Sequence, residues 1–262
     1  ATVMYSVLPS EAVNDWGWRI PFLLAGPLGL IAHYIRTKLE DSPTYQEMQK
    51  AIDKADDSNH PIRDLFRHHF KELVISFGAC VLNAVGFYVV LTYLPVYLET
   101  AVGMDPSQSS LITTISLIVY VAFIFGSGHL SDKFGRKKML IIACVSFIVL
   151  TVPAFMLLNT ADFFIVLVVE LVLCLALTIN DGTLSSYLTE TFPTAVRYTG
   201  FALSFNMANA IFGGSASFIS TALIAATGSN LAPAWYMVGV SCLALVAMIL
   251  SHEHTGKDLA DV

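Results

Sequence analysis

The chain has 262 residues, of which 55% are hydrophobic and only 13% are charged, and its mean hydropathy is +0.67. Soluble globular domains carry about 25% charged residues, so this composition excludes an ordinary water-soluble domain and indicates a protein that crosses a membrane several times. The formal net charge of −6 says little about the orientation of the chain, because the orientation of a membrane protein depends on the side where each Lys and Arg lies.

The first residues predict that the chain is the later part of a longer protein. The sequence starts at Ala1, with neither an initiator Met nor a basic segment followed by a cleavage site. Residues 1–9 are apolar, as the end of an earlier membrane helix would be. A first complete helix is predicted from the Trp-rich stretch at 16–22 to about Ile35, since tryptophans beside Arg19 are typical of a membrane interface.

Residues 36–72 form the one long polar stretch, in which basic and acidic residues alternate. Its periodic parts predict short surface helices or a solvated linker rather than a catalytic domain, because it contains no cluster of nucleophiles or ligands. Six further apolar runs have the length of a bilayer-spanning helix, about 20 residues, so about seven transmembrane helices are predicted in all. These runs are 73–98, 111–127, 139–158, 163–187, 199–227 and 233–250.

The distribution of charge tests this count of helices. If loops alternate between two sides, residues 36–72, 128–138, 188–198 and the tail after Leu250 share one side. That side holds every Lys and Arg except Arg19. It is therefore predicted to be cytoplasmic, with the C-terminus inside, because cytoplasmic loops of membrane proteins are enriched in Lys and Arg.

The cysteines and the tail do not predict a metal site. The tail residues His252, Glu253 and His254 are interpreted as solvated polar groups, since no partner cluster accompanies them. The cysteines are interpreted as core or lipid-facing thiols, because they lie in apolar runs without ligand spacing. They are Cys80, Cys144, Cys174 and Cys242.

The stretch 128–138, Gly-His-Leu-Ser-Asp-Lys-Phe-Gly-Arg-Lys-Lys, separates two of the predicted spans. We predict a tight cytoplasmic turn, in which Gly128 and Gly135 allow the backbone to bend sharply. Asp132 can pair with Arg136, with helix ends or with lipid headgroups. A generic basic loop would explain the charges alone, but not the glycines, the serine and the aspartate at these spacings.

This stretch resembles the loop signature of the major facilitator superfamily, G-x-L-[SA]-D-[RK]-x-G-R-[RK]. The matching residues are Gly128, Leu130, Ser131, Asp132, Lys133, Gly135, Arg136 and Lys137. Further stretches resemble the metabolite:proton symporter group, which includes proline/betaine transporters and carriers of organic acids. They include 16–22, 27–29, 39–43, 93–98, 191–200 and 212–214.

The resemblance implies an all-α membrane protein with the major facilitator fold, about twelve helices in two related halves. In this chain the long polar stretch comes first, two predicted helices follow, and the signature comes next. In the superfamily fold, this order makes 73–250 the C-terminal six-helix bundle. Residues 1–35 become the end of the N-terminal bundle, 36–72 the central cytoplasmic loop and 251–262 the cytoplasmic tail. The rest of the N-terminal half is expected to be missing from this chain.

Two acids inside one predicted span mark a candidate pathway, because charge within a bilayer is costly. Glu170 and Asp181 are about three helical turns apart, with Thr178 near the same line. One interpretation is that they line a cavity, where either carboxyl could load and release a proton. The alternative is that they only bond to neighbouring helices or, for Glu170, which is nearer the outer surface, that the side chain simply reaches water. Other polar or aromatic candidates for the solute or proton pathway are Asn83, Tyr88, Tyr93, Asn206 and Asn209.

A cage of Tyr88, Tyr93 or Tyr120 with an acidic group would suit a quaternary ammonium ion such as betaine. Glycines at 213 and 214 are predicted to allow close helix packing rather than to touch the solute. By analogy with the superfamily, Glu190 and Arg197 join Asp132 and Arg136 in an ion-pair cluster that closes the inner mouth. Alternatively, these charges only orient loops at the headgroups.

The expected function is solute:proton symport of a small zwitterionic osmolyte or amino acid, of the proline/glycine betaine type, by alternating access. The alternative is proton symport of an organic acid such as 2-oxoglutarate, citrate or shikimate, and a non-transporting membrane scaffold is a weaker one. No enzyme activity, cofactor, metal or nucleic-acid partner is expected. The expected partners are the solute, H⁺ as coupling ion, the lipid bilayer and the missing N-terminal half, in a bacterial inner membrane.

Overall fold

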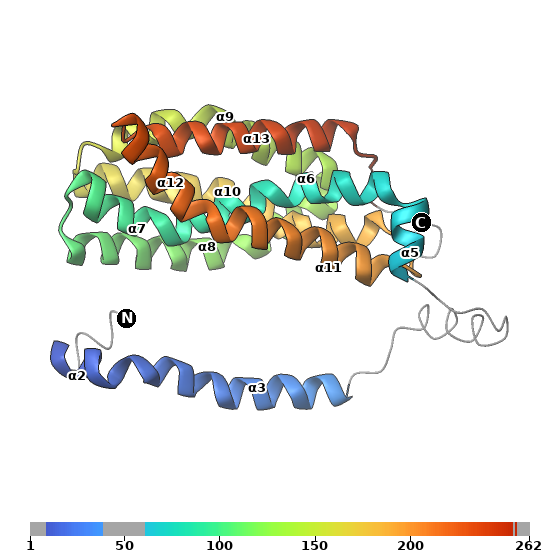
Figure 1. Cartoon of the computed structure of the whole chain (residues 1–262), viewed down its shortest axis with the longest axis horizontal. Helices are drawn as coiled ribbons and strands as arrows, with labels where there is room; N and C mark the ends of the chain where they lie inside the picture. The colour runs from blue at the N-terminus through green and yellow to red at the C-terminus, as the bar shows by residue number, and fades with distance from the viewer. Residues whose placement is uncertain (1–8, 39–60, 254, 256–262) are drawn as a thin grey trace. The chain divides into compact units, whose positions relative to one another are not determined.

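The computed structural model describes residues 9–38, 61–253 and 255 (Figure 1). Predictions for the apolar remnant at 1–8, for residues 39–60 of the long loop, and for His254 and 256–262 of the tail lie outside the described residues. The chain divides into two compact units, 1–56 and 57–262, which are described separately.

The first unit consists of α2 (Ser10–Asp15), a short 3₁₀ turn η1 (Gly17–Arg19) and α3 (Ile20–Lys38). The predicted helix is therefore present, and it continues a few residues beyond Ile35. The Arg19 guanidinium lies 4.3 Å from the centre of the Trp18 ring and donates to the Asp15 carbonyl oxygen at 2.6 Å. Helix α3 is not among the described helices that are long and apolar enough to cross a membrane, so its span of the bilayer stays a prediction.

The second unit contains six helices that are long and apolar enough to cross a membrane, among the described residues, and this confirms the six predicted runs. Their bounds are Phe70–Val102 (α6, η2, α7 and η3), Pro106–Phe134 (α8), Arg136–Leu158 (α9), Phe163–Thr191 (α10), Arg197–Thr227 (α11, η4 and α12) and Ala232–Leu250 (α13). A short amphipathic helix, α5 (Pro61–His68), precedes them and buries Leu65 against Phe192 and Val196.

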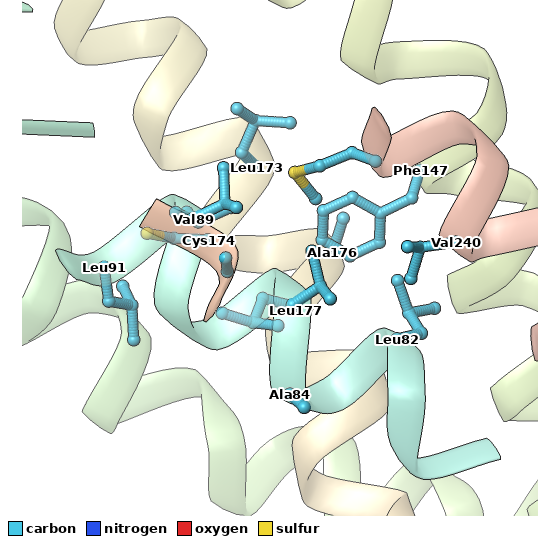
Figure 2. Packing of buried hydrophobic residues seen from close by; sticks show 14 of the residues in the cluster. Leu82, Ala84, Val89, Leu91, Phe147, Leu173, Cys174, Ala176, Leu177 and Val240 are labelled. Atoms are coloured by element: carbon cyan, nitrogen blue, oxygen red, sulfur yellow. The ribbon is translucent and has the colours of Figure 1, made fainter. Parts of the chain in front are cut away.

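Helices α6 and α10 form the centre of this bundle. Helix α10 packs against α6, α8, α9 and α11, and α6 packs against α10, α11 and α13. Figure 2 shows the apolar core that they share, with side chains such as Leu82 from α6, Phe147 from α9, Leu177 from α10 and Val240 from α13. Gly86 of α6 makes room for this packing, since an added Cβ would lie 3.0 Å from Leu177 Cδ1.

Burial is uneven across the six spans. The apolar part of the first span is 78% buried, whereas that of α8 is 22% buried and that of α11–α12 is 17% buried. Figure 1 shows α8 and α11 along one side of the bundle and α9 and α13 along the other. Within this unit, α8 and α11–α12 therefore expose the most surface.

Two spans contain π-helical turns where the cavity described below is formed. They are η2 (Tyr88–Tyr93) in the first span and η4 (Asn209–Gly213) in the fifth. Such wide turns are frequent at functional sites because they re-aim side chains. The predicted packing role of Gly213 is confirmed, since its missing Cβ would lie 2.8 Å from the Tyr88 ring.

The predicted turn at 128–138 is wrong in its extent. Helix α8 continues to Phe134 and α9 begins at Arg136, so only Gly135 breaks the helical path, with φ of +100°. Gly128 is helical and does not bend the chain. Its small size instead lets α8 approach α10, because a Cβ there would lie 3.3 Å from the Gly182 carbonyl oxygen.

Candidate functional site

Asp181 lies where three helices of the second unit meet. It is part of α10, and its Oδ1 accepts a hydrogen bond from Asn83 Nδ2 of α6. Its Oδ2 accepts a second bond, of 2.6 Å, from the Tyr120 hydroxyl of α8. Two donors on different helices fix the orientation of the carboxylate and offset part of the cost of removing its charge from water.

The carboxylate faces a cavity of about 290 Å³. This volume is close to the lower end of the range of small-molecule sites, about 300–1,000 Å³. Its wall combines aromatic rings with polar groups, and no Lys or Arg is among the described residues that line it. The lining residues are Asn83, Phe87, Tyr88, Tyr120, Asp181, Leu184, Ser185, Phe205 and Asn209.

This combination of groups suits one end of a solute in particular. A fixed carboxylate attracts a positive group, and aromatic faces attract cations through their quadrupole. The amides of Asn83 and Asn209 can donate to or accept from a second polar group. The cavity can therefore hold a small molecule with an ammonium group.

Four of the predicted pathway residues line the cavity together: Asn83, Tyr88, Asp181 and Asn209. Asn206 is not among the lining residues; its side chain is exposed and donates to the Ala202 carbonyl oxygen of its own helix at 2.7 Å.

Three other predicted residues lie in packed surroundings outside the cavity wall. Tyr93 is buried, and its hydroxyl accepts from Thr221 at 3.4 Å. Thr178 is buried between α10 and α8, where it accepts from the Ser127 hydroxyl at 3.0 Å. Glu170 has no exposed surface.

Sequence reasoning did not find Phe87, Leu184 and Phe205 in the wall, and it considered Tyr120 for its ring rather than its hydroxyl. Phe205 precedes Asn209 by one helical turn, so helical spacing placed it on the same face. The bond from Tyr120 to Asp181 joins two helices, and the spacing within one helix carries no signal for it.

A second polar cluster surrounds Arg136 at the start of α9. The guanidinium forms ion pairs with Asp132 of α8 and with Glu190 of α10, the latter at 3.2 Å. It also donates to the Ser131 hydroxyl at 2.7 Å. Three of the four predicted gate charges are thus together, and Arg197 Nε donates to the Phe192 carbonyl oxygen at 3.0 Å.

The tail contacts this cluster, although the side chains of His252 and Glu253 are exposed to solvent as expected. Glu253 Oε2 accepts from the Lys137 backbone N–H at 3.2 Å, and Thr255 Oγ1 accepts from the Arg136 N–H at 2.9 Å. In return, Lys137 Nζ donates to the Ser251 carbonyl oxygen at 2.6 Å. Gly135 has no side chain that could cap α9, so the first N–H groups of this helix find acceptors in the tail.

The other basic residue of the signature, Lys133, lies 6.0 Å from the centre of the neighbouring Phe134 ring and has no ion pair among the described residues. The part of the chain that the structure describes also contains no group of three or more His, Cys, Asp or Glu side chains that could hold a metal ion.

Comparison with known families agrees with this architecture. The profile of the Major Facilitator Superfamily matches residues 1–208 and, in a second and overlapping match, residues 77–260. The chain belongs to the major facilitator superfamily. The six spans, the signature and the all-helical second unit are thus parts of one fold of multi-pass membrane transporters.

Relatives within this superfamily have names that refer to osmolytes. A Staphylococcus aureus (strain COL) protein, provisionally named a proline/betaine transporter, is 32% identical over 264 residues, which are 99% of this chain and 56% of that protein. The ectoine/proline transporter ProP of Corynebacterium glutamicum is 32% identical over 95% of this chain and 51% of its own length.

A third relative is the glycine betaine/proline/ectoine/pipecolic acid transporter OusA of Dickeya dadantii. It is 30% identical over 97% of this chain and 52% of its own length. The chain therefore spans about half the length of these relatives.

Proposed function

We propose that this chain is part of a secondary active transporter that carries a small zwitterionic osmolyte or amino acid, of the proline/glycine betaine type, together with protons. The observation that carries the proposal is the cavity of about 290 Å³ in which Asn83 and Tyr120 hold the Asp181 carboxylate beside aromatic rings. The names of the relatives support the same class of solute.

The proposed mechanism is alternating access between two bundles. Residues 73–250 act as the C-terminal bundle, with 1–35 belonging to the N-terminal bundle, 36–72 as the central loop and 251–262 as the tail. The exposed side over α8 and α11–α12 lies toward the N-terminal half of the same transporter, which supplies the other wall of the cavity. The transporter lies in the inner membrane of a bacterium, and its basic side and its C-terminus face the cytoplasm.

Uptake by proteoliposomes that contain the whole transporter tests this function. With an inward proton gradient, labelled proline or glycine betaine is expected to accumulate, and Asp181→Asn is expected to abolish accumulation, because the solute loses the charge that holds its ammonium group. Glu99→Gln, which removes an exposed carboxyl at the end of the first span, serves as the matched control and keeps wild-type uptake.

Labelled 2-oxoglutarate in the same assay distinguishes the alternative solute class. A dicarboxylate needs at least one buried cation, and the described wall contains none. Uptake of 2-oxoglutarate without proline or betaine uptake would move the assignment to organic acids. If the wild-type protein takes up every one of these solutes equally well with and without the proton gradient, symport with protons is overturned.

The Arg136 cluster is proposed to close the inner mouth while the transporter faces outward. Glu190→Gln removes one of the two ion-pair partners of Arg136 and is expected to favour the inward-open state. A cysteine placed at Ser185 in the cavity wall then reacts faster with a membrane-impermeant maleimide added from the cytoplasmic side. Equal reaction rates with and without the Glu190 substitution would contradict a gate and leave the cluster an orienting role.

A further inference from the structure

Helix α10 contains a second carboxyl group, whose surroundings differ from those of Asp181. Glu170 precedes Asp181 by 11 residues, about 16 Å along the helix axis. Its side chain has no exposed surface, and neither carboxyl oxygen forms a regular hydrogen bond among the described residues. It faces the hydroxyl groups of Ser116 and Thr113 on α8.

In the part of the chain that the structure describes, no charged side chain compensates this carboxyl. Among the described residues, the groups that interact with it are the two α8 hydroxyls and the Cys174 thiol, one turn along α10. The helices α6, α9 and α11, which also pack against α10, contribute no charged group to these interactions. Both ion pairs in the described part of the chain belong to Arg136.

The two carboxyl groups are therefore suited to different tasks. Asp181 has two donors and faces an open cavity, so a charged carboxylate is tolerated there. An ionised Glu170 would be a fully buried charge without an ion-pair partner among the described residues, faced only by two hydroxyl groups, so the neutral acid is the form that these surroundings favour.

A row of buried polar side chains connects the two sites. Cys174 follows Glu170 by one turn of α10, and the Tyr120 hydroxyl of α8 donates to Asp181. Both Cys174 and Tyr120 belong to the buried core of the bundle.

We propose that Glu170 binds the coupling proton, whereas Asp181 binds the ammonium group of the solute. This inference rests on the proposed function and assigns its two cargoes to two residues. In the packed conformation Glu170 is a neutral acid. When α8 and α10 separate enough to admit water, its O–H bond breaks, the proton passes to water as hydronium, and the carboxylate that remains takes up a proton again before the interface closes.

Glu170→Gln, assayed in proteoliposomes of the whole transporter, separates the two roles. The variant is expected to bind proline or betaine with wild-type Kd and to exchange labelled for unlabelled solute, since both reactions need no net proton movement. Accumulation driven by a proton gradient is expected to disappear, with the internal concentration reaching only the external one. Asp181→Asn is expected to lose binding, exchange and accumulation together.

Other results would overturn the assignment. Gradient-driven accumulation by Glu170→Gln would exclude Glu170 as the proton site, and loss of solute binding by this variant would place Glu170 in the solute site. If the wild-type protein accumulates neither solute, the proposed function fails and this inference fails with it. If the wild-type protein and Glu170→Gln both accumulate solute, the proposed function stands and only this inference is overturned.

A measurement on the unmodified protein keeps the proposal testable if Glu170→Gln does not fold. Dicyclohexylcarbodiimide is an apolar reagent that adds to protonated carboxyl groups. During turnover it is expected to label Glu170, and mass spectrometry of peptides locates the adduct. The exposed Glu99 is the internal control and stays unlabelled. Absence of the adduct on Glu170 would overturn the proposal.

Discussion

The Asp181 side chain connects three helices through its hydrogen bonds. Its position in an apolar run was visible in the sequence, because a carboxylate in a bilayer-length stretch is costly and needs a reason. Its two donors were not predictable, since Asn83 and Tyr120 come from helices that are 98 and 61 residues away in the sequence. The same limit applies to Glu170, whose complete burial depends on how α8 packs against α10.

Tyr120→Phe tests the hydrogen bond at this scale. The ring remains in the wall of the cavity, and only the donor to Asp181 is lost. A hydrogen bond to a charged group contributes about 1.5–3 kcal/mol, so we expect the Kd for the transported solute to rise by roughly tenfold or more. Isothermal titration calorimetry on the purified transporter measures this change.

Tyr93→Phe is the matched control for this substitution. It also removes a tyrosine hydroxyl from the second unit, but that hydroxyl only accepts from Thr221 at 3.4 Å and lies outside the cavity wall. We expect its Kd to equal that of the wild type. Equal affinities of Tyr120→Phe and the wild type would show that the hydroxyl does not support the carboxylate.

At the scale of whole helices, the apolar runs predicted the six spans well because the bilayer fixes their length. The errors fell where helices extend past the apolar core. The polar residues from Gly128 to Phe134 continue α8 by almost two turns, so the predicted loop is reduced to Gly135. Charge marks the membrane boundary, but a helix does not have to end there.

Gly182→Ala tests the close approach of α8 and α10. A Cβ on Gly182 would lie 2.7 Å from the Ile124 carbonyl oxygen and 2.9 Å from the Gly128 nitrogen, both of which are backbone atoms that cannot rotate away. We expect the helices to be forced apart and the free energy of unfolding to fall by about 1–3 kcal/mol, as for other overpacked sites. Thermal unfolding in detergent measures the effect as a lower Tm.

The control for this prediction is Gly126→Ala, in α8. Its added Cβ would meet nothing within 4 Å, so the Tm is expected to stay the same or to rise slightly, since alanine favours helices. Equal Tm values for the two variants would mean that the α8–α10 interface relaxes without cost.

At the scale of the whole molecule, polar contacts join the spans of the second unit at both ends. At one end Arg136 joins α8, α9 and α10, and at the other the Asn230 side chain donates to Asn159 at 3.0 Å and to the Ala101 carbonyl oxygen at 3.1 Å. The signature motif predicted the charged end, because its residues are contiguous. The other end depends on loops that are distant in the sequence, so no local pattern indicated it.

The tail provides a prediction at this scale. The double variant Glu253→Ala and Thr255→Val removes both acceptors at the start of α9, and the loss of a helix cap costs about 0.5–2 kcal/mol. We expect a lower Tm than that of the wild type in detergent. His252→Ala changes the exposed neighbour and is expected to leave the Tm unchanged, so equal losses in the two variants would contradict a capping role.

The same contacts set how quickly deuterium enters the protein. The first N–H groups of a helix usually exchange fast with the solvent, because they have no partner within the helix. Here the N–H groups of Arg136 and Lys137 donate to residues 119 and 116 positions later in the chain. Their exchange is therefore slow only while the tail remains docked, and these two amides report whether the tail stays bound to the bundle as the transporter changes state.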